Sequence, residues 1–182
     1  MALSVQPSAF SLINMPNRTA EYWINKLQLA THIEGGAFRE IYRSAVTAPA
    51  ATLPPAFTGD RSFCTSIYFL LQHHQFSAFH KIKSDELWHW YYGDALIVYE
   101  ITQNGQLIEH RLGCDPDNNE SFQCVIGAGN WFAARLAPGG SYALVGCTVS
   151  PGFDFIDFEL ADRKELMAIY PQHASLIGEL TI

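Results

Sequence analysis

The sequence predicts an all-β protein, a sandwich or barrel of short strands with a short helix region at each end. From residue 62 onward, nine segments rich in β-branched and aromatic residues follow one another at near-regular spacing. Gly, Pro, Asn and Asp residues that favour turns separate these segments. Helical spacing of apolar residues occurs only before residue 30 and after residue 160. Many short strands in a row indicate a sandwich or barrel and not an α/β sheet.

The N-terminal part is expected to form a short helix, a loop and a first strand. Asn17 or Thr19 can cap a helix through Leu29, because their side-chain oxygens can accept from free backbone N–H groups. The loop is expected at Glu34-Gly35-Gly36, where two glycines allow backbone angles that other residues avoid. Phe38–Arg43 then has the composition of a strand.

The middle of the chain is predicted to be almost entirely β. The segment 45–59, rich in Ala, Pro and Thr, is expected to be an exposed excursion. Asn104-Gly105 predicts a tight hairpin of type I′, a turn that needs positive φ at both central residues. The predicted strands after the excursion are 62–71, 76–82, 86–92, 95–101, 107–112, 121–126, 131–136, 142–149 and 153–160.

The last twenty residues change to a helical pattern. Asp162 and Glu165 have the spacing of a capping box, and apolar residues follow at helical intervals. Pro171 can begin a second short helix that carries Leu176 and Ile177. We expect both helices to pack on the outside of the barrel.

Composition and charge exclude several classes of protein. The chain has 182 residues, 48% hydrophobic and 16% charged, which suits one domain with a core at about residues 34–160. The net charge of −7, from 11 basic and 18 acidic residues, argues against nucleic-acid binding. No apolar run is long enough to cross a membrane, and the first seventeen residues do not resemble a secretory signal. We therefore expect a cytoplasmic protein.

The four cysteines are expected to be free thiols. They contain no CxxC pair and no histidine at zinc-finger spacing, so a structural zinc site is not expected. The cysteines are Cys64, Cys114, Cys124 and Cys147.

The segment His80–Gly93 carries the strongest motif. The first motif of the cupins has the form H-x-H, three or four residues, E, six residues, G, and His80, Glu86 and Gly93 are in register with it. Ile82 stands where the second histidine would be. Phe132 stands where the histidine of the second cupin motif would be.

Three wider segments, Glu34–Arg39, Ser84–His89 and Tyr142–Phe153, resemble the Cupin_5 family, formerly a domain of unknown function (DUF985). The resemblance extends from Glu21 to the C-terminal helix. It implies an RmlC-like double-stranded β-helix, the cupin or jelly-roll barrel, which is commonly dimeric, so a homodimer is expected. It implies no settled activity.

The same motif argues against a bound metal. A cupin metal site uses three histidines and one glutamate, and Ile82 and Phe132 have no ligand atoms. If a metal were bound, His80 and Glu86 would be its ligands, but firm binding needs about three protein ligands. His89 is expected on the opposite face of its strand from Glu86, because side chains alternate along a strand. We expect no metal and no other cofactor.

His80 and Glu86 are the predicted catalytic residues, acting as an acid–base pair in an interior pocket. An imidazole titrates near neutrality, and burial among aromatic rings can raise the pKa of a carboxyl. The alternative is that the two residues simply hydrogen-bond each other inside the barrel. Residues with aromatic faces, phenol groups or a guanidinium were assigned to substrate binding: Arg39, Tyr68, Trp88, Trp90, Tyr99 and Phe132.

Three functions remain open from the sequence. The first is a metal-independent cupin that binds a small polar metabolite, sugar-derived by analogy of fold or of another kind, with epimerase- or isomerase-like proton transfer. The second is a ligand-binding cupin without catalysis. The third is a divergent metal-dependent cupin enzyme. The expected partner in each is a small molecule.

Overall fold

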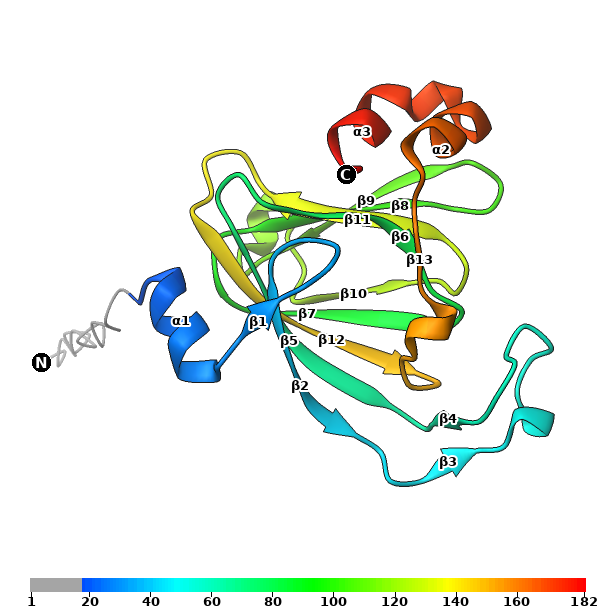
Figure 1. The fold of residues 1–182 in the computed structure, drawn as a ribbon. Coiled ribbons are helices and arrows are strands. Elements are labelled where there is room, and N and C mark those ends of the chain that lie inside the picture. The colour runs from blue at the N-terminus through cyan, green and yellow to red at the C-terminus, as the bar shows by residue number, and fades with distance from the viewer. Residues whose placement is uncertain (1–17) are drawn as a thin grey trace, which may run out of the picture.

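Two antiparallel sheets form a jelly-roll barrel in the computed structural model, which describes residues 18–182 (Figure 1). The six-stranded sheet contains, in spatial order, β1 (Ala30–Thr31), β2 (Ala37–Arg43), β5 (Thr65–Gln72), β12 (Tyr142–Ser150), β7 (Asp85–Gly93) and β10 (Gln123–Ile126). The five-stranded sheet contains β13 (Glu159–Leu160), β6 (Phe76–Lys81), β11 (Trp131–Leu136), β8 (Leu96–Ile101) and β9 (Leu107–Leu112). The predicted all-β fold class is therefore confirmed.

The main core lies between the two sheets. Phe69, Trp88 and Val145 of the six-stranded sheet pack against Val98 and Phe132 of the five-stranded sheet. All are nearly inaccessible to solvent. Alternation along each strand explains this arrangement, because every second side chain points between the sheets.

Helix α1 (Ala20–Leu27) covers one end of the outer face of the six-stranded sheet. Its side chains pack with Leu70 of β5 and Leu144 of β12. Thr19 is the N-cap and accepts a hydrogen bond from the backbone N–H of Tyr22. Asn17, the other residue considered for this cap, lies outside the described residues.

The C-terminal helices cover the outer face of the five-stranded sheet, as predicted. They are α2 (Arg163–Ile169), a 3₁₀ turn at Pro171–His173 and α3 (Ala174–Glu179). Asp162 caps α2 by accepting from the backbone N–H groups of Lys164 and Glu165. Leu166 and Ile177 pack against Phe79 on the outside of the barrel. Among the described residues no helix is long and apolar enough to span a membrane.

The hairpin at Asn104-Gly105 forms, but its predicted turn type is wrong. β8 and β9 pair in continuous antiparallel register, from Leu96 opposite Leu112 to Ile101 opposite Leu107. Gly105 has φ of 80°, whereas Asn104 is not in the positive-φ region. The loop is longer than a two-residue turn, because Thr102 donates its N–H to Gln106 and so closes a wider connection.

The predicted strand 153–160 is also wrong. A 3₁₀ turn occupies Phe155–Asp157, and only β13 is extended. The physical reason is the Asp154 side chain, which accepts from the N–H of Ile156 and bends the chain into a turn. In Figure 1 this orange segment lies beside the ends of β7 and β12.

The excursion at 45–59 is a projecting arm with little regular structure (Figure 1). It contains β3 (Thr47–Ala48) and a 3₁₀ turn at Ala50–Thr52, and β3 pairs with β4 (Arg61–Ser62). A further 3₁₀ turn, Pro116–Asn118, lies between β9 and β10.

Candidate functional site

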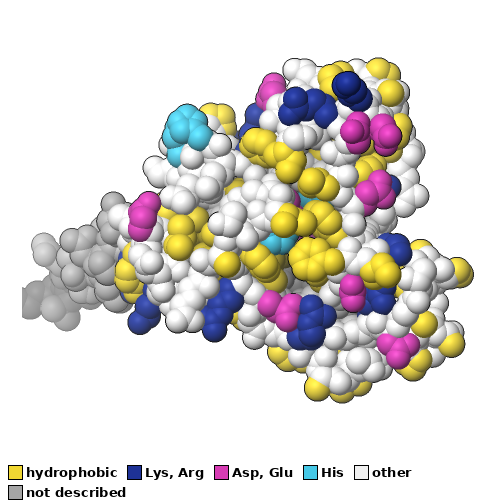
Figure 2. Space-filling model, viewed as in Figure 1, with side chains coloured by type: hydrophobic (Ala, Val, Ile, Leu, Met, Phe, Trp, Pro, Cys, Tyr) yellow, Lys and Arg dark blue, Asp and Glu magenta, His cyan; other side chains and the backbone are white. Residues whose placement is uncertain are grey.

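A cavity of about 240 Å³ opens between the two sheets. Its walls come from β2, β5, β6, β7 and β12, together with the segment 153–158. Aromatic rings form much of the surface, namely Phe38, Phe153, Phe155 and Phe158. On the face of the molecule seen in Figure 2, histidine atoms lie near the centre, surrounded by hydrophobic side chains, with acidic and basic side chains close by. The interior is therefore mainly apolar with a small polar group of residues.

Glu34 is the centre of that polar group. Its side chain is only 9% exposed, and its Oε1 accepts a hydrogen bond of 2.9 Å from the hydroxyl of Ser77. Its Oε2 lies 3.2 Å from Nε2 of His80 and 3.5 Å from Nδ1 of His32. One carboxyl oxygen thus faces two imidazole nitrogens.

The hydrogen bonds of the two imidazoles decide which atom carries the proton. Nδ1 of His80 lies 2.7 Å from the backbone oxygen of Ala78, which can only accept, so this nitrogen donates. Nδ1 of His32 accepts from the backbone N–H of Glu34 at 3.4 Å. In neutral imidazoles both nitrogens that face Glu34 therefore carry lone pairs. The proton between the three groups must come from the carboxyl of Glu34.

Burial has opposite effects on the two kinds of group. It raises the pKa of Glu34 to about 7, and it lowers the pKa of His80 to about 4. Burial also lowers the pKa of His32, although the Glu34 carboxyl partly offsets this. At neutral pH the imidazoles are uncharged, and Glu34 is divided between its protonated and ionised forms.

Glu86 supplies a second buried carboxyl to the same cavity. It is 7% exposed. It lies in β7 between Val149 of β12 on one side and Ile126 of β10 on the other. Its pKa is raised to about 8, mainly by burial and also by the nearby Glu34 carboxyl, while a hydrogen bond with the thiol of Cys147 works in the other direction. Glu86 is therefore a protonated acid at neutral pH.

The mouth of the cavity carries an ion pair. Arg43 donates from Nε and Nη2 to the two oxygens of Glu40, at 3.0 and 2.7 Å. Its Nη1 donates to the backbone oxygen of Phe153 at 3.0 Å. These contacts join β2 to the segment 153–158 across the opening.

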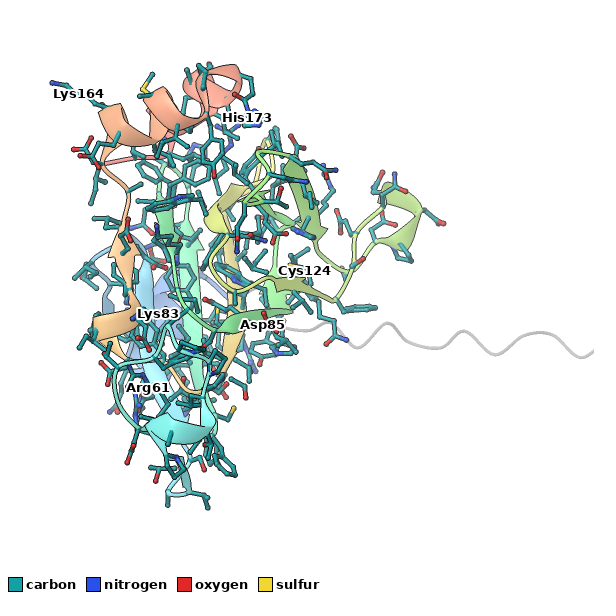
Figure 3. The ribbon with its side chains drawn as sticks, turned by 90° about the vertical axis from the view of Figure 1, so that its right-hand side faces the viewer. Arg61, Lys83, Asp85, Cys124, Lys164 and His173 are labelled. Atoms are coloured by element: carbon teal, nitrogen blue, oxygen red, sulfur yellow. The ribbon has the colours of Figure 1, made fainter. Side chains whose placement is uncertain are left out.

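The segment 153–158 is held in place by a buried salt bridge. Asp157 accepts from Nε and Nη2 of Arg61 at 2.6 and 2.8 Å, and Lys83 lies 3.1 Å from the same carboxylate. Figure 3 shows Arg61 and Lys83 on the side of the molecule where the orange segment with Asp157 runs. This wall of the cavity is therefore anchored to β4 and to the loop after β6.

The two residues predicted to be catalytic both line the cavity. Their nearest polar partners differ from the prediction, since His80 contacts Glu34 and Glu86 contacts Cys147. Their catalytic role stays a prediction.

The six residues assigned to substrate binding do not line the cavity. Trp88 and Phe132 point between the sheets as expected, but they fill the core, and Phe132 packs on His80 with ring centroids 4.1 Å apart. Trp90 lies farther along β7, where its Nε1 donates to the backbone oxygen of Asp94. Trp88 and Phe132 are each only 1% exposed, so the core encloses both rings.

The other three residues lie on outer faces of the sheets. Tyr68 contacts Tyr91 on the outside of the six-stranded sheet. Tyr99 packs under the C-terminal helices and accepts from Arg135. Arg39 donates to the backbone oxygen of Leu27 and to Gln28 near the end of α1. Strand alternation turns all three away from the interior.

Glu34, His32 and Ser77 are the site residues that sequence reasoning missed. Glu34 precedes two glycines, and Gly35 has φ of 112°. A Cβ on Gly35 would lie 2.1 Å from the backbone oxygen of Phe76, so no larger residue fits there. The backbone oxygen of Glu34 also accepts from Ala78. This close approach of the loop to β6 places Glu34 beside His80. An acidic residue directly before Gly-Gly was the available signal.

The residues of the cavity do not fit the metal centre found in many cupins. Ile82 and Phe132 are apolar at the two positions where histidines would act as ligands, and both are buried. The free nitrogen of His80 is directed at Glu34 and not at Glu86. Within residues 18–182 no group of three or more His, Cys, Asp or Glu side chains is arranged to hold a metal ion.

Comparison with known proteins agrees with this architecture. The model of the Cupin_5 family, described as Cupin superfamily (DUF985), matches residues 21–161. The uncharacterized protein YML079W of Saccharomyces cerevisiae is 30% identical in an alignment over 168 residues that covers 85% of this chain and 82% of the yeast protein.

Solved structures extend the comparison. A hypothetical protein from Leishmania major has a TM-score of 0.82 and 33% identity over 90% of this chain and 99% of its own. Protein SO0799 from Shewanella oneidensis has a TM-score of 0.80 and 36% identity, covering 91% and 98%. A variant of oxalate decarboxylase from Bacillus subtilis shares only the fold, with a TM-score of 0.50 and 16% identity over 82% of this chain and 36% of its own. This chain belongs to the Cupin_5 family of the cupin superfamily.

Proposed function

We propose that this cupin binds a small polar metabolite in the cavity and transfers protons on it, as an isomerase or epimerase does. One observation carries the proposal: the carboxyls of Glu34 and Glu86, with pKa values raised to about 7 and 8, line one largely apolar cavity. Catalytic acids and bases work best when their pKa lies near the working pH. Two such groups in one cavity provide a base and an acid.

In the proposed reaction the ionised form of Glu34 is the base. It removes a proton from a carbon next to a carbonyl, so that a C–H bond breaks and an O–H bond forms on Glu34. The protonated Glu86 gives its proton to the developing enolate and becomes a carboxylate. An enol hydroxyl then returns a proton to Glu86 while Glu34 delivers its proton, exchanged or not with solvent, to a carbon of the enol. A carbonyl forms again, and both residues recover their starting forms.

His80, His32 and Ser77 are positioning residues in this scheme. They hold the carboxyl of Glu34 in one orientation through the contacts at 3.2, 3.5 and 2.9 Å. Once Glu34 has taken up the substrate proton, its O–H can donate a hydrogen bond to the lone pair on Nε2 of His80, which holds the protonated carboxyl in place. The apolar rings around them exclude water and keep the pKa values of the two carboxyls raised.

The test is a screen of sugars, sugar nucleotides, keto acids and amino ketones in deuterium oxide, with proton NMR to detect exchange of substrate protons. We expect the wild type to catalyse exchange on a compound that also raises its melting temperature. Glu34→Gln and Glu86→Gln should each slow this exchange by about a hundredfold or more, since a general acid or base contributes about that much.

The exposed variant Glu159→Gln is the matched control, because Glu159 pairs with Lys81 outside the cavity. It should keep the wild-type exchange rate. A ligand that binds tightly but exchanges no protons would make the protein a binding module. Exchange that survives both cavity substitutions would contradict the proposed roles.

A further inference from the structure

We propose that the cavity takes a ligand with a positively charged nitrogen, a small organic ammonium ion. The inference rests on the proposed function, because it names the substrate class of the same cavity. It follows from three independent features, which are the charges of the lining, the partners of Glu86 and the arrangement of the rings.

The ionisable lining is acidic, and its one permanent cation is already engaged. The carboxyls are Glu34, Glu40, Glu86 and Asp154, and the guanidinium belongs to Arg43. Arg43 donates three hydrogen bonds, two to Glu40 and one to the backbone of the segment 153–158. A carboxylate or phosphate ligand would therefore meet acidic groups without a free cation to bind it.

The imidazoles do not supply the missing positive charge. His80 and His32 both have lowered pKa values because they are buried, so they are neutral at physiological pH. Nδ1 of His80 donates to Ala78, and its other nitrogen faces Glu34. His80 therefore has no N–H left to donate to a ligand, and neither ring carries a positive charge.

Glu86 lacks a cationic partner within the described part of the chain. It is more than nine-tenths buried, it lines the cavity, and its side-chain hydrogen bond is with the thiol of Cys147. A thiol is a weak donor. Glu86 is protonated in the empty cavity at neutral pH, and an ammonium placed against it favours release of that proton. The resulting carboxylate accepts a charge-assisted hydrogen bond, which is about twice as strong as a neutral one.

The rings of Phe153, Phe155 and Phe158 suit an ammonium ion. Their centroids are 5.0 to 6.3 Å apart and their planes meet at 69 to 80°, so the rings form a corner and do not stack. Ring faces carry partial negative potential and attract cations, more strongly where water is excluded. All three rings line the same cavity as Glu86.

The test uses three compounds with one carbon skeleton and three headgroups: dimethylbutylamine, dimethylbutanol and dimethylbutanoate. Binding to wild type, Glu86→Gln and Glu159→Gln is measured at neutral pH by calorimetry and ligand-observed NMR. We expect the amine to bind wild type at least about tenfold more tightly than the alcohol, and the carboxylate to bind least. Glu86→Gln should weaken the amine about tenfold or more without changing the alcohol. Glu159→Gln should match wild type for all three compounds.

Three results would overturn the inference. The first is equal or tighter binding of the alcohol or the carboxylate. The second is amine binding that Glu86→Gln leaves unchanged. The third is absence of amine binding to wild type at millimolar concentration. None of these results decides the proposed proton transfer, which the deuterium-exchange screen measures without these probes.

Discussion

Glu34 is a carboxyl placed where a proton donor is required. Its Oε2 faces lone-pair nitrogens of His80 and His32, and its Oε1 accepts from Ser77. If Glu34 were ionised, its Oε2 and the two imidazole nitrogens would all be acceptors, with no proton between them, in a region that excludes water. The geometry and the raised pKa of Glu34 therefore agree that its protonated form stabilises the folded protein.

Substitution of Glu34 should separate stability from chemistry. In Glu34→Gln the amide N–H₂ can donate to both imidazoles and the amide oxygen can accept from Ser77, so we expect a free energy of unfolding within about 1 kcal/mol of wild type. In Glu34→Leu these partners lose their hydrogen bonds, and we expect a loss of about 2–5 kcal/mol. Urea unfolding of the two variants measures the difference. Similar losses in both would refute the hydrogen-bond assignment.

The segment 153–158 is the element that closes the cavity, and it is held by charge more than by regular structure. Its regular backbone structure is a single 3₁₀ turn at Phe155–Asp157, and the two-residue strand β13 follows it. The Arg61–Asp157 pair is buried, with 4% exposure on each side chain. Opposite charges at 2.6 Å hold the pKa of Asp157 below its usual value despite its burial. The pair thus fixes the position of three of the cavity's rings.

Breaking the pair should destabilise the protein and loosen this wall. For Asp157→Asn we expect a loss of about 3–5 kcal/mol, because Arg61 remains buried without a charged partner. Hydrogen exchange should accelerate first in residues 155–160. Glu159→Gln, which removes an exposed pair with Lys81, should cost no more than about 1 kcal/mol. Equal stability of the two variants would mean that the buried pair is not an anchor.

The C-terminal helices are a second element whose contribution can be measured. Ile177 of α3 is 0% exposed against the outer face of the five-stranded sheet, whereas Ile169 at the end of α2 is 60% exposed. Ile177→Ala should therefore cost about 2–5 kcal/mol through lost burial and a cavity. Ile169→Ala should cost about 0.5 kcal/mol or less. Thermal and urea unfolding give both values, and a small effect at Ile177 would contradict packing of α3 on the barrel.

At the scale of the whole molecule, the barrel encloses ionisable groups in their neutral forms. Glu34 and Glu86 have raised pKa values, while His80 and His32 have lowered ones. The carboxyls contribute stability that is fully present below about pH 4.5 and is lost as the pH rises through about 7 and 8. The imidazole of His80 contributes stability that is present above about pH 6.5 and is lost as the pH falls through about 4.

The free energy of unfolding should therefore be highest in the mildly acidic range and fall on both sides. Between about pH 7 and 8 the loss through Glu86 should be about 1 kcal/mol, because its unfolded form is ionised there while its folded form is still mostly protonated. Urea unfolding at several pH values checks this, with Glu86→Gln as the comparison. The variant should lose the decline between pH 7 and 8. A decline that persists unchanged in Glu86→Gln would assign it to other groups.

The positions of the strands could be predicted from the sequence better than the residues of the site. Strand positions followed from alternation and turn residues, so most of β2 to β12 lie within a few residues of the predicted ranges. The segment 153–160 was misassigned because its aromatic composition favours a strand, whereas Asp154 and Asp157 hold it in a turn through side-chain contacts. Local composition does not report a salt bridge to a residue 96 positions away in the chain.

The sequence by itself determined the jelly-roll fold class, the two end helices and the presence of His80 and Glu86 at one cavity. Hydrophobic periodicity and turn residues suffice for the all-β class and the end helices, whereas the jelly-roll arrangement and the shared cavity follow from the resemblance of the motifs to the Cupin_5 family. Only the tertiary structure brought Glu34 and His32 to His80, and only it turned Arg39, Tyr68 and Tyr99 outward. Loop packing and strand pairing join residues far apart in the chain, so the contacts that set the pKa values of the site arise when the barrel closes.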